Sequence, residues 1–120
     1  MDVNAAMLEA RRLLDAELLT EGALLAVIQR GEMHLAAAML ATAADVPITV
    51  VGRAATLRSA KGLVSLVWKA GFSMGVAGPV QTLLARMSPT ASLRGAPDKG
   101  FPLAQEEMRW QIEFLAKMGR

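Results

Sequence analysis

The chain has no cysteine and no tyrosine, and its aromatic rings are limited to two tryptophans and three phenylalanines in 120 residues. Without a thiol it cannot form a disulfide framework, a cysteine nucleophile or a thiolate zinc site. The scarcity of aromatic rings argues against a surface that stacks bases or sugars. The composition is compatible with a reducing compartment, and we expect a cytoplasmic protein.

Long apolar runs are also missing. No segment reaches about 18 uninterrupted apolar residues, so we expect no helix that crosses a membrane. The first residues, which include Asp2 and Glu9, lack the basic-then-apolar order of a secretion signal. The length is that of one domain, large enough to bury roughly two thirds of the unfolded chain's surface. We therefore expect one helical domain over 1–120, either complete or part of a longer repeat protein.

Acidic residues are absent between Asp45 and Asp98. The segment up to Asp45 holds seven acids and three bases, and the segment from Asp98 onward holds four of each. The charges between them are all positive, namely Arg53, Arg58, Lys61, Lys69, Arg86 and Arg94. This separation of charge is the feature that a partner could recognise.

Short helices joined by glycine and proline breaks account for most of the chain. Hydrophobic residues make up 53%, and the most frequent of them, alanine and leucine together with methionine, are strong helix formers. Gly31 and Gly71 end two helices, and Pro47 ends a third because the residue before a proline avoids the helical region. We predict helices over 5–19, 20–31, 32–44, 48–57, 59–70, 75–87 and from about 102 onward.

Local signals refine several of these helices. Asn4 is the expected N-cap of the first helix and Thr20 that of the second. The β-branched run at 48–51 leaves a short strand as an alternative to the fourth helix. Pro79 is expected in the first turn of the helix over 75–87. Residues 88–101 hold two glycines and two prolines and are predicted to form a long loop that is mobile or wraps the surface.

A repeat of about 40 residues is visible inside the chain. The run "TEGALLAVIQRG" at 20–31 aligns with "AKGLVSLVWKAG" at 60–71, so that Gly31 matches Gly71. A second helix and a proline-marked turn follow each glycine. Paired helices with this period are typical of HEAT-like arrays, in which stacked hairpins build a shared core. We expect six to seven helices as stacked antiparallel hairpins of this kind, with an irregular helical bundle as the alternative.

The run from Leu18 to Pro89 resembles the C-terminal part of a bacterial family of uncharacterised helical-repeat proteins, known as domain of unknown function 2336. The resemblance is carried by an apolar helix ending in "RG", a helix of the type "EMHLAAAMLATAADVP", a short helix, and the helix "GLVSLVWKAGF". Members of the family are longer chains of helical repeats. The resemblance implies a helical-repeat fold in a fragment or short member, and it brings no established activity.

No catalytic or metal-binding constellation is recognisable. His34 is the single histidine, and neither a zinc site nor a Ser-His-Asp triad can be built around it from this pattern. The glycines at 71, 75 and 78 lack the lysine and hydroxyl residue of a phosphate-binding loop and predict a tight turn between helices. We therefore expect no enzyme activity, no metal and no cofactor.

Two sets of residues are candidates for an interaction surface. The basic set comprises Arg53, Arg58, Lys61 and Lys69, whose spacing brings at least Arg58 and Lys61 together. The apolar set comprises Trp110 and Phe114, which lie on the broad apolar arc of the last helix.

These sets favour a non-enzymatic protein–protein interaction module. We expect another protein, or a second copy of the chain, as the partner. The alternative is a binder of nucleic acid or another polyanion through the basic set, and salt dependence would distinguish the two.

Overall fold

Seven helices form between the glycine, proline and capping residues that interrupt the chain. The computed structural model describes residues 1–98 and 100–118. The helices are α1 (Val3–Asp15), α2 (Glu21–Gln29), α3 (Met33–Ala44), α4 (Ile48–Thr56), α5 (Ala60–Lys69), α6 (Met74–Leu84) and α7 (Gln105–Lys117). No strand occurs among the described residues. The predicted all-α class is confirmed, and the alternative strand at 48–51 is wrong because these residues begin α4.

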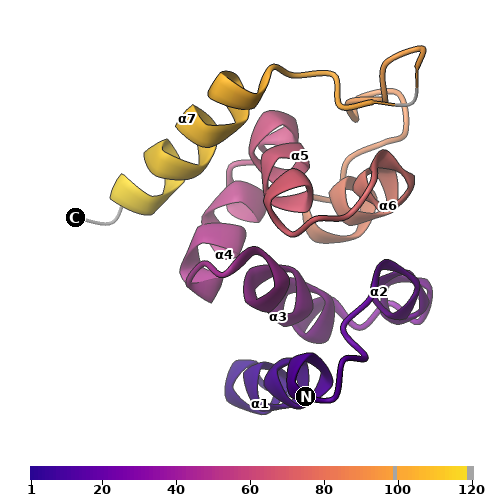
Figure 1. Cartoon of the computed structure of the whole chain (residues 1–120), viewed down its shortest axis with the longest axis vertical. Helices are drawn as coiled ribbons and strands as arrows, with labels where there is room; N and C mark the ends of the chain where they lie inside the picture. Colours follow the sequence, from indigo (N-terminus) through magenta and orange to yellow (C-terminus); the bar gives the residue numbers. More distant parts are fainter. Residues whose placement is uncertain (99, 119–120) are drawn as a thin grey trace.

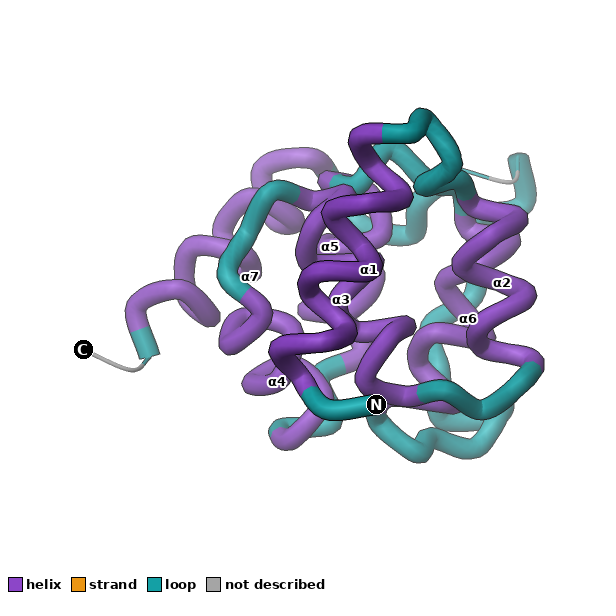
Figure 2. The backbone as a smooth tube through the Cα atoms, turned by 90° about the horizontal axis from the view of Figure 1, so that it is seen from below, coloured by secondary structure: helices purple, strands orange, loops and turns teal. Residues whose placement is uncertain are grey.

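The helices surround α3, which contacts α1, α2, α4, α5 and α6. Figure 1 shows α1 at one end of the molecule and α7 at the other. Seen from below, α1 lies across α3, while α2 and α6 lie side by side (Figure 2). The overall extents are 34 × 33 × 25 Å, so the helices form a compact globule. None of the described helices has the length and apolar content that crossing a membrane requires.

The central position of α3 follows from its sequence, "MHLAAAMLATAA", which has no charged residue. Met39 and Leu40 are fully buried, as are the four alanines Ala36, Ala38, Ala41 and Ala44. Small side chains allow neighbouring backbones to approach, and α1 uses Ala6 and Ala10 for its own buried positions. A helix that is apolar on most of its circumference is stable only when other helices surround it. Five other helices contact α3.

The helix starts are set by hydroxyl and carboxylate caps. Thr20 accepts a hydrogen bond from the amide of Ala23 at 3.1 Å, which confirms the predicted cap. The predicted cap at Asn4 is wrong, because Asp2 accepts from the amide of Ala5 at 2.7 Å and α1 begins at Val3. The predicted end at residue 19 is also wrong. The chain leaves the helix after Asp15, since Glu17 adopts a left-handed conformation with a φ of 60°.

Left-handed residues follow each of the first six helices. Gly31 and Gly71 adopt the left-handed conformation without steric cost, and the sequence predicted that each ends a helix. The other four are not glycines: Glu17, Asp45, Arg58 and Arg86 have φ values between 51° and 60°. In this conformation the amide of the following residue donates a hydrogen bond to a carbonyl in the last turn of the helix. An example is the 2.8 Å bond from the Leu18 amide to the Leu13 carbonyl.

The segment after α6 wraps over the surface and is anchored by Gln81. Gln81 is fully buried, and its side-chain amide donates to the carbonyl of Leu93 at 3.1 Å. Its carbonyl oxygen accepts from the amide of Leu93 at 2.8 Å. The predicted loop at 88–101 lies within this segment, apart from residue 99, which is outside the described residues.

The boundaries of the last two helices also differ from prediction. The helix over 75–87 ends at Leu84, because Arg86 takes the left-handed conformation. Pro79 is the sixth residue of α6 and therefore lies beyond its first turn. Gln105 begins the last helix, three residues after Pro102.

The C-terminal helix packs on α5 and α4. Its buried face consists of Met108, Ile112 and Leu115. Leu115 meets α5 at Gly62, where a Cβ atom would lie 3.0 Å from Leu115 Cδ1 and 2.9 Å from the capping hydroxyl of Ser59. The absence of a side chain at Gly62 is therefore what allows α7 to lie this close to α5.

Replacing Gly62 with valine is expected to lower the free energy of unfolding by about 1–3 kcal/mol, because the new side chain displaces Leu115 and the Ser59 cap. The matched control is Gly52→Val in α4, where a Cβ meets nothing within 4 Å. This control should change stability by no more than about 0.5 kcal/mol. Urea denaturation followed by circular dichroism measures both, and equal effects would contradict a close approach at Gly62.

Glycine at position 17 is expected to stabilise the protein by about 0.5–1 kcal/mol. The left-handed conformation costs a residue with a Cβ about 1–2 kcal/mol, and part of the gain is lost to the greater freedom of glycine in the unfolded chain. Gly31→Ala, at a φ of 73°, should have the opposite sign. Both are measured by thermal or urea unfolding. A loss of stability in Glu17→Gly would show that the glutamate has a role beyond its backbone conformation.

Candidate functional site

Two cations of the acid-free segment, Arg53 and Lys69, donate to carbonyls at the ends of helices. Arg53 donates from Nη1 to the carbonyl of Leu115 at 2.7 Å and to that of Ala116 at 3.3 Å, near the end of α7. Lys69 donates from Nζ to the carbonyl of Ala44 at 2.7 Å, at the end of α3. Helix C-termini carry partial negative charge and unsatisfied carbonyls, so a cation there is stabilising.

The remaining two members of the basic set also have contacts within the chain. Arg58 donates from Nη2 to the carbonyl of Arg86 at 3.0 Å, just beyond the end of α6. Lys61 lies 3.8 Å from Glu107 of α7. The four predicted residues therefore contact three different parts of the chain, because Arg53 and Lys61 contact opposite ends of α7. Arg58, Lys61 and Lys69 remain exposed, whereas Arg53 is half-buried.

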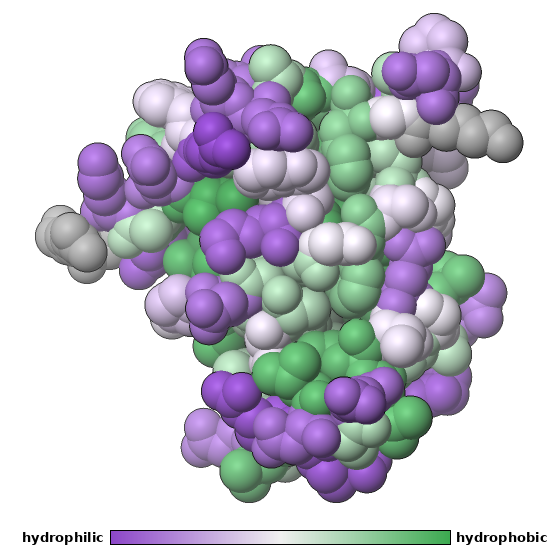
Figure 3. Space-filling view, viewed as in Figure 1, coloured by the Kyte–Doolittle hydropathy of each residue, from purple (hydrophilic) through white to green (hydrophobic). Residues whose placement is uncertain are grey.

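The predicted apolar pair lies on the outer face of α7. Trp110 is 54% exposed and Phe114 is 46% exposed. Their rings stack with centroids 5.2 Å apart and an angle of 6° between planes. Two of the five aromatic residues of the chain thus face solvent side by side, which is unusual unless they serve recognition. Figure 3 shows further apolar surface where α7 meets α4 and between α3 and α1.

An open groove of about 780 Å³ lies between α3, α4 and the end of α6. This volume is within the range of ligand and peptide sites. The lining residues are Val3, Met33, His34, Ala37, Ile48, Thr49, Val51, Gly52, Ala55, Thr56, Arg58, Leu84, Ala85 and Arg86. Most of them are apolar, and we call this feature the groove.

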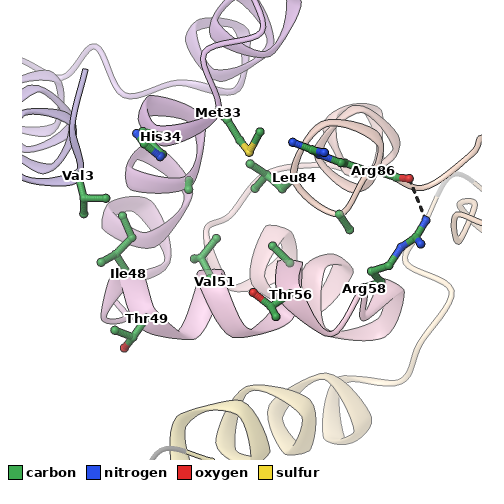
Figure 4. Close-up of a pocket in the computed structure, with 14 residues that line it drawn as sticks. Val3, Met33, His34, Ile48, Thr49, Val51, Thr56, Arg58, Leu84 and Arg86 are labelled. Carbon is green, nitrogen blue, oxygen red and sulfur yellow. Dashed lines mark hydrogen bonds between the residues drawn. The ribbon is translucent and has the colours of Figure 1, made fainter.

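Helix α4 supplies the largest share of the groove lining. Ile48, Val51 and Ala55 recur at spacings of three and four residues, so they share one side of the helix. Gly52 lies between them and carries no side chain, with nothing within 4 Å of where its Cβ would be. Figure 4 shows the side chains of Ile48 and Val51 on the same side of α4. The small residues Gly52 and Ala55 keep the groove open.

Two arginines close one end of the groove. Arg58 and Arg86 occupy the left-handed positions after α4 and α6, and the bond from Arg58 to the Arg86 carbonyl joins these two helix ends. In Figure 4 the Arg86 side chain extends back toward Met33. Within residues 1–98 and 100–118, neither guanidinium forms a salt bridge with a carboxylate. Arg58 therefore places a positive charge at this end of the groove, and Arg86 places a second one nearer to Met33, each without a carboxylate partner among the described residues.

The other end of the groove is formed by Val3, His34 and Ile48 (Figure 4). His34 Nδ1 lies 2.8 Å from the carbonyl of Met1, so the ring is engaged as a donor to the N-terminal segment. No group of three or more metal-ligating side chains is found in the part of the chain that the structure describes.

A surface ion pair lies on α1. The pKa of Glu9 is lowered because Arg12 donates hydrogen bonds to its carboxylate, and the pKa of Arg12 is raised by the same contact. Glu9 and Arg12 are three residues apart, the ordinary spacing of helix-surface ion pairs. This pair stabilises a surface helix and does not mark a reactive group.

Reasoning from sequence did not select Arg86 or Gly52 as site residues. Arg86 was visible as one of the six cations of the acid-free segment, but its proximity to Arg58 depends on how α6 packs. The available signal for Gly52 was its position in the middle of a predicted helix. Glycine lowers helix propensity, so a glycine at such a position indicates that a side chain is unwanted there.

Comparison of the chain with protein-family models, with curated proteins and with solved structures found no match. The resemblance to the helical-repeat family therefore stays a prediction.

Arg53→Met is expected to lower the free energy of unfolding by about 1–2 kcal/mol, because the carbonyls of Leu115 and Ala116 lose a charged donor. Arg94→Met is the control, since Arg94 lies exposed in the segment after α6 and should change stability by no more than about 0.5 kcal/mol. Urea denaturation measures both. Equal effects would show that the contact contributes little to the docking of α7.

Proposed function

We propose that this chain is a non-enzymatic protein–protein interaction module built from HEAT-like helical hairpins. The hairpin arrangement is supported by equivalent positions 40 residues apart. Leu24 and Val27 of α2 are buried, as are Val64 and Val67 of α5. Gly31 and Gly71 take the same left-handed conformation after these helices. Equivalent burial and equivalent helix ends are what a repeated hairpin requires.

The observation that carries the proposal is the groove, which combines an apolar lining with two arginines at one end. An apolar groove of this kind receives the apolar face of a helix or extended peptide. Arg58 and Arg86 would orient that segment by pairing with a carboxylate, since guanidinium groups bind carboxylates with defined geometry. The partner segment is therefore expected to carry spaced apolar residues and an acidic residue at one end.

The polyanion alternative is less well supported. Arg53, Arg58 and Lys69 donate to main-chain carbonyls, and Lys61 pairs with Glu107. Phosphate binding by the whole set would compete with the helix-end contacts of Arg53 and Lys69, two residues that do not line the groove. Salt distinguishes the alternatives, because a polyanion complex loses about 10³–10⁵ in affinity between 50 and 200 mM salt when six to ten phosphates are contacted.

A displayed library of helical peptides tests the proposal. Selection against the wild-type protein should enrich peptides with apolar residues three or four apart and an acidic residue at one end. Gly52→Gln fills the groove in a helix that tolerates a side chain there, and should weaken binding of the enriched peptides at least tenfold. Gly22→Gln is the matched control, because Gly22 is an exposed helical glycine outside the groove.

Three outcomes would contradict the proposal: no enrichment, equal loss in the Gly52 and Gly22 variants, or binding that disappears between about 50 and 200 mM salt as a phosphate-like contact does.

A further inference from the structure

Two exposed surfaces of this chain are complementary to one another. The groove is apolar and ends at two arginines. The outer face of α7 is apolar at its centre, carries the acids Glu106 and Glu113 beside it, and ends with Lys117 one turn beyond Phe114. The apolar residues and acids of α7 match the apolar lining and the arginines of the groove. The outer face of α7 is therefore a candidate partner for the groove.

The outer face of α7 has the pattern of a helix that binds in a groove. Trp110 and Phe114 are four residues apart, which places them one turn apart on the same side. Glu106 precedes Trp110 by one turn, and Glu113 is the neighbour of Phe114. All four side chains are exposed. Anchors spaced by one turn with a carboxylate at one end are the features proposed above for a segment that fits the groove.

Within one molecule this face does not enter the groove. α7 packs through Met108, Ile112 and Leu115, and so turns Trp110 and Phe114 away from its own core. In Figure 4, α7 lies on the opposite side of α4 from the groove side chains. A contact between the two surfaces therefore requires two molecules.

We propose that α7 of one copy binds in the groove of a second copy. Trp110 and Phe114 lie on the apolar lining, and Glu106 lies at the end formed by Arg58 and Arg86. This inference rests on the proposed function of the groove and names the partner as the chain itself. The two molecules use different surfaces, so the contact is heterologous and each copy keeps one surface free for another.

The test is the mass of the protein in solution, measured by size-exclusion chromatography with light scattering between about 1 μM and 1 mM, a range that covers contacts of modest affinity. The wild-type mass should rise with concentration from the 12.7 kDa of one chain to about twice that value and beyond, because a heterologous dimer still offers one free groove and one free α7 face to further copies. Gly22→Gln should behave as the wild type.

Two variants each remove one of the surfaces. Gly52→Gln blocks the groove and leaves the α7 face intact. The double variant Trp110→Ser and Phe114→Ser removes the aromatic pair, which is exposed, and leaves the groove intact. Each variant alone should remain at the mass of one chain. If the double variant fails to fold, Glu106→Lys reverses an exposed charge on the same face and should weaken the association.

An equal mixture of the groove variant and the α7 variant is the decisive sample. Each supplies the surface that the other lacks, so the mixture should form a complex of two chains and stop there. A two-fold symmetric interface would not recover in this way. A mixture that remains at the mass of one chain overturns the proposal, as does a wild-type protein that is monomeric over the whole range. Selected peptides that still bind the groove in that case would leave the proposed function standing.

Discussion

The fold is organised around the burial of α3. This helix has no charged residue and is apolar on most of its surface, so it is stable only when other helices surround it. Five helices do so, and the small alanine side chains of α3 and α1 let them approach. α7 lies outside this arrangement and docks on α5 at Gly62. The chain is thus a core around α3 with one additional helix whose outer face is left uncovered.

Contacts with helix C-termini account for several of the cations in the acid-free segment. Arg53, Lys69 and Arg58 donate to carbonyls at or just beyond the ends of α7, α3 and α6. A carboxylate at the same positions would be repelled by the partial negative charge of a helix C-terminus. An acid-free middle segment is therefore compatible with a structural role for its cations. Arg58 and Arg86 are also placed to bind a partner, because both residues line the groove.

The short helix α4 contributes both to the groove and to the placement of α7. One side of α4 lines the groove with Ile48, Val51 and Ala55, and Arg53 on the same helix holds the end of α7. The placement of α7 consequently affects which apolar residues face solvent. A protein with few aromatic residues has two of them exposed on α7, and this exposure is one of the observations behind the proposed interaction surface.

The sequence alone predicts the helical class and most helix boundaries, because capping residues, glycine and proline act within one turn of the chain. Thr20, Gly31 and Gly71 are examples. It did not determine the left-handed ends at Glu17, Arg58 and Arg86, where residues with a Cβ are held by the surrounding structure. Only tertiary packing decided which distant residues meet, as with Arg53 and Leu115, 62 positions apart. The groove belongs to this second group, since it exists only once α3, α4 and α6 have packed together.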